Sequence, residues 1–127
     1  MSNNMIILYV KDQQNSKLFY ERLLNQTPLL DVPGMTEFKI NGEFYLGLMP
    51  EEGISKILGE SVPHPKLGNG IPRCELYLYF DNIEKRYSRL SEFGGKQICP
   101  SEKRPWGDTV AYGTDPDGHI IALAKTE

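Results

Sequence analysis

Few residues in this chain have the type and spacing needed for catalysis or metal binding. His64 lies between two prolines and His119 follows an Asp-Pro-Asp-Gly turn, and neither has an evident serine or cysteine nucleophile as a partner. Cys74 and Cys99 lack the CxxC spacing of metal and redox sites, so two reduced thiols are the simplest interpretation. Glu75 remains as a candidate, either as a general base or as a charged group that pairs with a basic residue or lines a cavity.

The first half of the chain contains the elements of one small α/β unit. The run MIILYV at 5–10 is a short, β-branched strand, and NSKLFYERLL at 15–24 has helical spacing with Asn15 or Ser16 as a possible N-cap. A hairpin follows, in which Asn41 and Gly42 fit a two-residue turn. This order predicts a strand, a helix and at least two further strands.

The second half repeats the same order. CELYLYF at 74–80 predicts a strand, and 82–93 predicts a helix that stops at a pair of glycines. A short strand at about 96–99 and a hairpin around Asp115-Pro116-Asp117-Gly118 complete the unit. We therefore predict an α+β fold with two βαβββ modules, at about 4–49 and 74–126, within one domain of 1–127. Residues 50–73 form a linker in which 51–59 can be a short helix.

Composition excludes several classes of partner. The net charge of −3 gives no basic face for nucleic acid, and no apolar run is long enough for a membrane span. The first residues have no positively charged segment before a short apolar run, so we expect no signal peptide and a cytoplasmic location.

Two segments of the chain resemble a known superfamily. They are YVKDQQNSKLFYERLL and ELYLYFDNIEKRYSRLSEFGGKQICPSEKRPWGDTVAYGTDPDGHIIALA, which are similar to the vicinal oxygen chelate superfamily of glyoxalases, bleomycin-resistance proteins and extradiol dioxygenases. The resemblance implies paired βαβββ modules that form an open, incomplete barrel around a cavity, and commonly a homodimer. It leaves open whether the modules of one barrel come from one chain or are exchanged between two.

Enzymes of the superfamily hold a divalent metal through four inward-facing strand positions. On this sequence the resemblance places those positions at Met5, Leu46, Glu75 and Ala122. Only Glu75 carries a suitable ligand, whereas a catalytic site needs about three protein ligands. We therefore expect neither a metal nor another cofactor, and the chain looks closest to the metal-free, bleomycin-resistance-like branch.

Aromatic residues give the remaining signal. Strand alternation places Tyr9, Tyr77 and Tyr79 on the inner faces, with Trp106 on a loop and Tyr112 on a neighbouring strand. With Glu75, they predict a cavity for a small organic ligand, aromatic or cationic, such as an antibiotic or a metabolite. The alternatives are a metal-dependent lyase or dioxygenase of the same superfamily, or a proton-transfer enzyme that uses Glu75.

Overall fold

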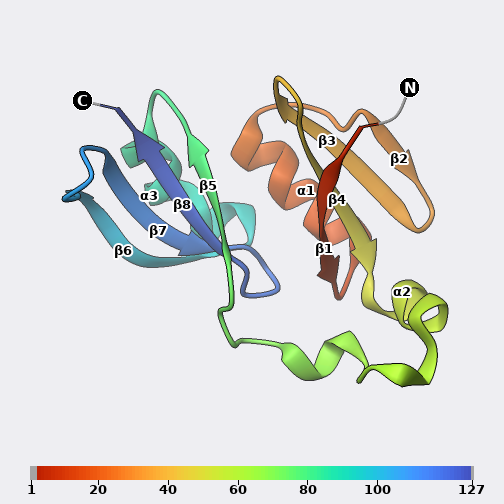
Figure 1. Ribbon diagram of the computed structural model, residues 1–127. Coiled ribbons are helices and arrows are strands. Elements are labelled where there is room, and N and C mark those ends of the chain that lie inside the picture. The colour runs from red at the N-terminus through yellow and green to blue at the C-terminus, as the bar shows by residue number, and fades with distance from the viewer. Residues whose placement is uncertain (1–2, 127) are drawn as a thin grey trace. The chain divides into compact units, whose positions relative to one another are not determined.

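The computed structural model of the protein describes residues 3–126 and contains two successive βαβββ modules (Figure 1). The chain divides into two compact units between Asn69 and Gly70. The first comprises β1 (Met5–Val10), α1 (Gln13–Leu24), β2 (Leu30–Val32), β3 (Met35–Asn41), β4 (Phe44–Pro50) and α2 (Glu51–Leu58), followed by two short 3-10 helices. The second comprises β5 (Glu75–Tyr79), α3 (Ile83–Phe93), β6 (Lys96–Lys103), β7 (Thr109–Thr114) and β8 (Ile120–Lys125). The predicted α+β class and the repeated βαβββ order are confirmed.

Each module has one four-stranded mixed sheet. The strand order is β1-β4-β3-β2 in the first module and β5-β8-β7-β6 in the second. In both, the first strand pairs in parallel with the last, and the other pairs are antiparallel. The helix supplies the crossover that a parallel pair requires, so the sheet has one face covered by the helix and one opposite face.

Helix α1 buries one face against the first sheet. Phe19, Tyr20 and Leu23 are fully buried, and the ring of Tyr20 lies 6.3 Å from that of Phe38 on β3. The helix begins two residues before the predicted segment, because the side chain of Asp12 accepts a hydrogen bond from the N–H of Asn15 at 3.0 Å. The predicted capping by Asn15 or Ser16 was therefore wrong.

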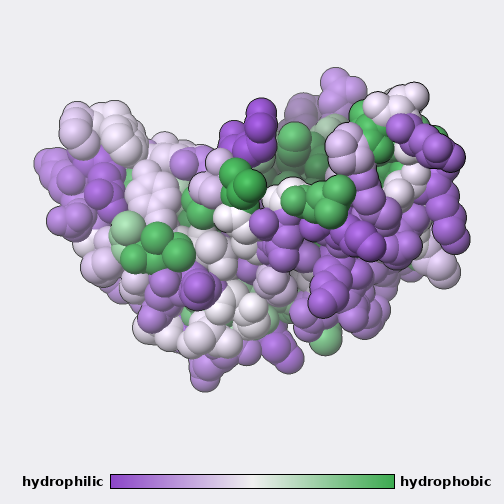
Figure 2. Space-filling model, turned by 90° about the horizontal axis from the view of Figure 1, so that it is seen from below, coloured by the Kyte–Doolittle hydropathy of each residue, from purple (hydrophilic) through white to green (hydrophobic). Residues whose placement is uncertain are grey.

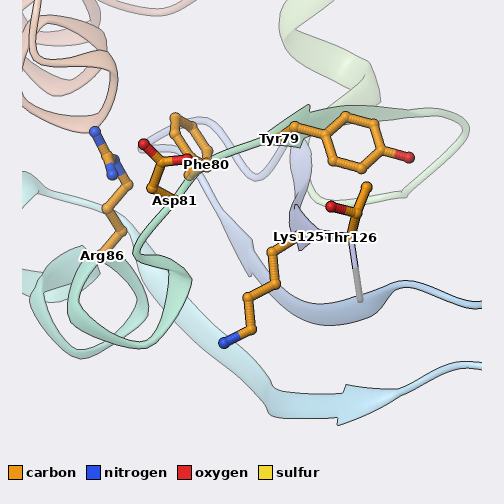
Figure 3. Close-up of a pocket in the computed structure, with 6 residues that line it drawn as sticks. All are labelled: Tyr79, Phe80, Asp81, Arg86, Lys125 and Thr126. Carbon is orange, nitrogen blue, oxygen red and sulfur yellow. The ribbon is translucent and has the colours of Figure 1, made fainter.

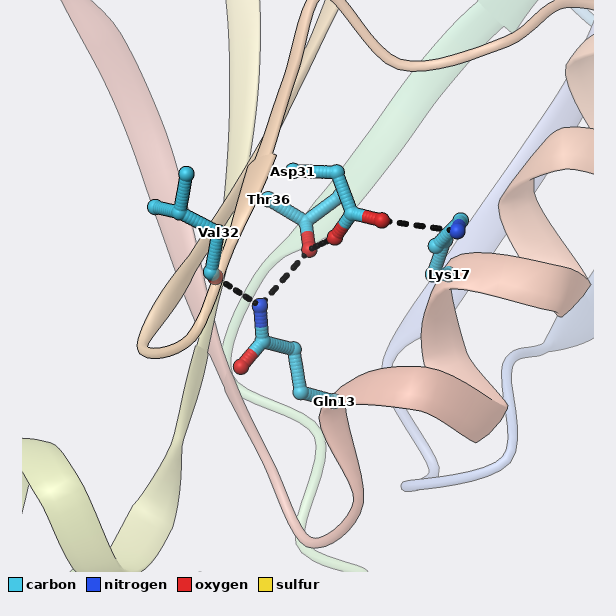
Figure 4. A network of polar contacts seen from close by, with 5 residues as sticks. All are labelled: Gln13, Lys17, Asp31, Val32 and Thr36. Carbon is cyan, nitrogen blue, oxygen red and sulfur yellow. Dashed lines mark hydrogen bonds and ion pairs between the residues drawn. The ribbon is translucent and has the colours of Figure 1, made fainter.

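A polar network fixes the β2–β3 hairpin to the start of α1 (Figure 4). The Gln13 side chain donates to the carbonyl of Val32 at 2.8 Å and to the hydroxyl of Thr36 at 2.9 Å. Thr36 in turn donates to Asp31 at 2.9 Å, and Lys17 forms an ion pair with Asp31 at 2.7 Å. Because Thr36 is fully buried, this network extends from the surface into the interior of the module and satisfies a polar group there.

Helix α3 covers the second sheet in the same way. Ile83 and Leu90 are fully buried, and Gly94 ends the helix in the left-handed conformation, as the glycine pair predicted. A β-carbon at Gly113 of β7 would clash with the Leu90 side chain, so glycine is required where the helix meets the sheet.

The two hairpins that were compared in the sequence have different turns. In the first module the turn residues are Gly42 and Glu43, since Asn41 pairs with Phe44. Gly42 has a φ of +47° and Glu43 has no positive φ, which is the pattern of a type II′ turn. The predicted Asn41-Gly42 turn was therefore one residue out of place. The predicted Asp115–Gly118 turn is confirmed by a hydrogen bond of 3.1 Å from the N–H of Gly118 to the carbonyl of Asp115.

The segment after β4 is less buried than either sheet. The predicted short helix is α2, whose Ile54 is buried, while Ile57, Leu67 and Ile71 are 72%, 70% and 69% exposed. On the face shown in Figure 2, hydrophobic residues form small, separate groups on a mainly hydrophilic surface. Within residues 3–126, no helix has the length and apolar character to cross a membrane.

Candidate functional site

The face of the second sheet opposite α3 carries three of the aromatic residues that the sequence predicted, Tyr77, Tyr79 and Tyr112. Along one row, Tyr77 of β5 and Tyr112 of β7 flank Ala122 of β8. Both tyrosines pack against a buried cluster of Val110, Ala122 and Ala124. The small alanines on the central strand leave room for rings from both neighbouring strands, so the tyrosines form part of one aromatic surface.

The loop between β6 and β7 supplies two more residues to this face. The N–H of Gly107 donates to the carbonyl of Arg104 at 3.0 Å, and the N–H of Arg104 donates to the carbonyl of Asp108 at 2.8 Å. Gly107 has a φ of +110°, which favours glycine at this point of the turn. The turn presents Trp106 and Asp108 toward β5, although β8 separates β5 from β7 in the sheet.

Asp108 is the centre of a hydrogen-bonded cluster that we call the Asp108 cluster, formed with Tyr77, Tyr79 and Trp106. One oxygen of Asp108, Oδ2, accepts from the hydroxyl of Tyr77 at 2.6 Å and from that of Tyr79 at 2.7 Å. The indole N–H of Trp106 donates to the Tyr77 oxygen at 2.8 Å. The rings of Tyr77 and Tyr79 meet edge to face, with centroids 5.6 Å apart. The structure thus brings three of the predicted ligand-binding residues into direct contact.

Hydrogen bonds within the cluster shift the pKa values of Asp108, Tyr77 and Tyr79. The hydrogen bonds from Tyr77 and Tyr79 lower the pKa of Asp108 below its ordinary value, and partial desolvation opposes this. The hydrogen bond to Asp108 raises the pKa of Tyr79 to about 12, while the pKa of Tyr77 is raised by desolvation first and by Asp108 second. At neutral pH the carboxyl group is therefore ionised and both phenols are neutral.

Sequence reasoning missed Asp108 and Arg104. Asp108 follows a Trp-Gly turn, and no motif or spacing connects it with tyrosines about 30 residues earlier in the chain. Arg104 donates to the carbonyl of Val110 at 2.9 Å and places its guanidinium 5.2 Å from the centre of the Tyr112 ring. These contacts hold Tyr112 and the loop together, and only the folded hairpin makes them visible.

A pocket of about 560 Å³ lies at the carboxyl ends of β5 and β8 (Figure 3). The guanidinium of Arg86 from α3 lies 4.3 Å from the centre of the Phe80 ring, and Lys125 pairs with Glu84 at 3.3 Å. Tyr79 belongs both to the lining of this pocket and to the Asp108 cluster, so the two features adjoin at the end of β5. The pocket is lined by Tyr79, Phe80, Asp81, Arg86, Lys125 and Thr126.

Glu75 and Tyr9, which were also predicted to bind the ligand, are not members of the Asp108 cluster. Glu75 is exposed at the start of β5 and, by strand alternation, shares the face of Tyr77. Tyr9 is 36% exposed on β1, in the other compact unit.

One of the four positions assigned to a metal site was misplaced. In the first sheet Met5 pairs with Tyr45 and Ile7 with Gly47, whereas Leu46 pairs with Ile6 and is fully buried. Leu46 therefore lies on the helix-facing side, opposite Met5. Since Ala122 pairs with Tyr77, two residues after Glu75, its counterpart in the first module is Gly47, which pairs with a residue two after Met5.

The error has a simple cause. Strands β4 and β8 both begin two residues after a turn glycine, Gly42 and Gly118 respectively. However, Met5 pairs with the second residue of β4, whereas Glu75 pairs with the first residue of β8. Counting forward from these glycines therefore gives registers that differ by one residue.

The turn before β8 holds another group of polar side chains. Ligand atoms of Asp115, Asp117 and His119 lie within 4.8 Å of one another. The buried Asp115 carboxylate accepts from the N–H groups of Asp117 and His119, both at 2.9 Å, and contacts Nδ1 of His119 at 2.7 Å. The carboxylate thus closes the turn, and His119 precedes β8 rather than beginning it.

Comparison with known proteins gives the family. A family model described as a glyoxalase-like domain matches residues 3–126, almost the whole chain. The chain belongs to the glyoxalase-like family. It is therefore a member of the vicinal oxygen chelate superfamily, as its sequence motifs suggested. This glyoxalase-like domain is also 30% identical over 125 residues to the uncharacterized protein YraH of Bacillus subtilis (strain 168), covering 94% of each chain.

Solved structures confirm the fold of the glyoxalase-like domain. A glyoxalase-related enzyme from Fulvimarina pelagi has a TM-score of 0.81 at 23% identity, over 98% of this chain and 88% of the other. A glyoxalase/bleomycin resistance protein/dioxygenase family enzyme from Burkholderia phytofirmans PsJN has a TM-score of 0.77 at 12% identity, over 97% of each chain. At these identities the similarity establishes the shared architecture.

Proposed function

We propose that this glyoxalase-like domain binds a small organic molecule, an antibiotic or a metabolite, and does so without a metal. The observation that carries the proposal is the aromatic face of the second module, where Tyr77, Tyr79 and Trp106 are joined around an ionised carboxylate. Tyr112 extends this face across Ala122.

The exposure of the rings supports a role in binding. Tyr79 is 57% exposed and Trp106 is 59% exposed, although both are large side chains that proteins usually bury in part. Their hydrogen bonds fix the polar tips and leave ring area available for contact with a ligand. Aromatic rings of this kind supply flat apolar area together with a few oriented polar atoms, which suits a small organic ligand.

The donor set does not fit the divalent metal that the fold family implies. Met5 offers a thioether, Gly47 has no side chain, Ala122 has a methyl group, and only Glu75 carries an oxygen ligand. Hard and borderline divalent ions require several oxygen or nitrogen ligands. The residues present therefore support no reaction step through a metal, and Glu75 lies at the rim of the proposed ligand site.

The aromatic rings and the acidic groups have separate roles in the proposed site. Trp106 and Tyr79 stack on the ligand, Tyr77 and Tyr112 form the wall behind it, and Glu75 contacts polar or positively charged substituents. The 560 Å³ recess beside Tyr79 accommodates an extended part of the ligand.

A thermal-shift screen tests the proposal directly. Purified protein is mixed with a panel of antibiotics and metabolites, once with a chelator and once with divalent metal ions. We expect at least one compound to raise the melting temperature to the same extent in both conditions. Stabilisation that requires a metal, or about one tightly bound divalent ion per chain by elemental analysis, would overturn it.

Replacement of Glu75 by glutamine separates binding from catalysis. In a binding protein the substitution weakens affinity for positively charged compounds and leaves the compound chemically unchanged. Loss of turnover by orders of magnitude for any compound found in the screen would instead establish an enzyme.

We also propose that the protein is a homodimer, as is common in its superfamily. Size-exclusion chromatography with light scattering gives the molar mass directly, and a mass near the 14.4 kDa of one chain would contradict the proposal.

A further inference from the structure

The Asp108 carboxylate has hydrogen-bond donors but, in the part of the chain that the structure describes, no positively charged partner. Two other acidic side chains on the surface have one: Asp31 pairs with Lys17 at 2.7 Å and Glu92 with Arg89 at 2.8 Å. Among residues 3–126, no ion pair includes Asp108. The two phenols that hold it are neutral, so the cluster keeps a net negative charge.

The geometry leaves one oxygen of this carboxylate available. Both tyrosine hydroxyls donate to Oδ2, and no described residue donates a hydrogen bond to Oδ1. The rings of Tyr77, Tyr79 and Trp106 are fixed close to the charge by the same hydrogen bonds. A fixed anion beside electron-rich aromatic faces attracts cations both by charge and by the quadrupole of the rings.

Nearby basic groups are engaged elsewhere. Arg104, on the same loop, contacts the Val110 carbonyl, the Tyr112 ring and, at 3.6 Å, the carboxylate of Glu102. Lys125, which lines the adjacent recess, pairs with Glu84. The charge at Asp108 is therefore left for a partner from outside the module.

We propose that Asp108 is the anchor for an organic cation, an ammonium or guanidinium group of the ligand, whose apolar part lies against Tyr79 and Trp106. This inference rests on the proposed function and adds the charge of the ligand and the residue that binds the charged group. It replaces Glu75 by Asp108 as the principal acidic contact, because Asp108 is held in position whereas Glu75 is exposed at the strand end.

The cluster keeps this anchor charged over the whole physiological range. The two phenol hydrogen bonds stabilise the carboxylate form and lower its pKa, so protonation occurs only in acid below the ordinary range for aspartate. Cation binding should therefore be independent of pH near neutrality and should decline only as the pH falls through that lowered value.

Trp106 provides the measurement, because it is the one tryptophan of the chain. Tryptophan fluorescence is titrated with phenyltrimethylammonium and with tert-butylbenzene, which has the same shape and no charge. We expect the cation to bind at least about tenfold more tightly than the neutral compound, as charge and cation–π attraction together allow.

Two substitutions locate the effect. Asp108→Asn keeps the shape and an acceptor oxygen for the phenols but removes the charge, and should abolish most of the preference for the cation. Glu92→Gln removes one charge from the outer surface of α3 and should leave the preference unchanged. Circular dichroism confirms that both variants are folded.

The outcomes separate this inference from the proposed function. Equal binding of the two probes, or a cation preference that survives in Asp108→Asn, overturns the role of Asp108 and leaves the aromatic site in place. Failure of the wild-type protein to bind phenyltrimethylammonium at millimolar concentration also overturns it. The proposed function fails separately, if the screen with chelator finds no stabilising compound.

Discussion

The two modules share one topology but differ in how each uses a buried or half-buried polar network. In the first module, Thr36 and Gln13 connect Asp31 to the helix, and Lys17 neutralises the aspartate at 2.7 Å. In the second, neutral phenols connect Asp108 to β5, and no described residue supplies a positive charge. The first network is complete within the module, whereas the second lacks a cation.

This difference supports the binding role proposed for the second module. The network around Thr36 joins α1 to the hairpin on the helix-facing side of the sheet, so its loss affects folding. The Asp108 cluster, by contrast, lies on the face of the second sheet that is opposite α3, where Tyr79 and Trp106 remain exposed. A charged group held rigidly on an exposed face contributes less to stability than to recognition.

The largest expected effect tests whether packing between α3 and its sheet determines the stability of the second module. In Gly113→Ala, the new β-carbon would clash with Leu90 and lie 2.8 Å from the carbonyl oxygen of Lys96, so we expect a loss of about 3 kcal/mol. Tyr77→Phe removes one hydroxyl from the Asp108 cluster and should cost about 1 kcal/mol. Denaturant unfolding measures both.

Gly47→Ala is the matched control for the first module. Its β-carbon would lie 3.0 Å from Met5 Sδ and from Ile7 Cγ1 and 3.3 Å from Met35 Sδ, and these side chains are only partly buried and can shift. We expect the cost to stay below about 1.5 kcal/mol. If Tyr77→Phe were as harmful as Gly113→Ala, the aromatic face would be structural and the comparison would fail.

The next effect concerns the first network. Thr36→Val keeps the shape of a fully buried side chain but removes its hydrogen bonds with Gln13 and Asp31, so we expect a loss of about 1–2 kcal/mol. Thr27 is exposed, and Thr27→Val should change the free energy of unfolding by less than about 0.5 kcal/mol. Equal effects of the two substitutions would show that the network does not stabilise the module.

A third prediction concerns ionisation within the Asp108 cluster. The pKa of Tyr79 is about 12 because its hydroxyl donates to a carboxylate, so Asp108→Asn should lower it toward the ordinary value of 10.0. Since the pKa is raised on folding, this hydrogen bond stabilises the protein fully below pH 10 and is lost as the pH rises toward 12. Absorbance titration of the tyrosinate band measures the change, and Tyr79→Phe identifies which transition belongs to Tyr79. Asp31→Asn should leave that transition in place.

The sequence predicted the elements of this fold better than the relations between them. Strand alternation correctly separated Leu76 and Leu78 from Tyr77 and Tyr79, because every second residue of a strand faces the same side. It placed Leu46 on the wrong face, since β1 pairs with β4 one residue further along than β5 pairs with β8, and a shift of one residue reverses the side on which a residue lies. Asp108 could not be found, because its partners are separated from it by about 30 residues and by a whole strand.

The smallest expected effect concerns Lys17, the cation of the first network, which has no counterpart in the Asp108 cluster. Lys17 lowers the pKa of Asp31 below its ordinary value of 3.8, and Thr36 contributes second. The ion pair therefore stabilises the module fully above that ordinary value and is lost as the pH falls through the lowered one. Lys17→Met should raise the pKa of Asp31, as measured from its carboxyl carbon by NMR, with little change in stability at neutral pH because the pair is partly exposed. If the pKa of Asp31 were unchanged in Lys17→Met, the first network, like the second, would depend on hydrogen bonds alone. The contrast between the two modules would then disappear.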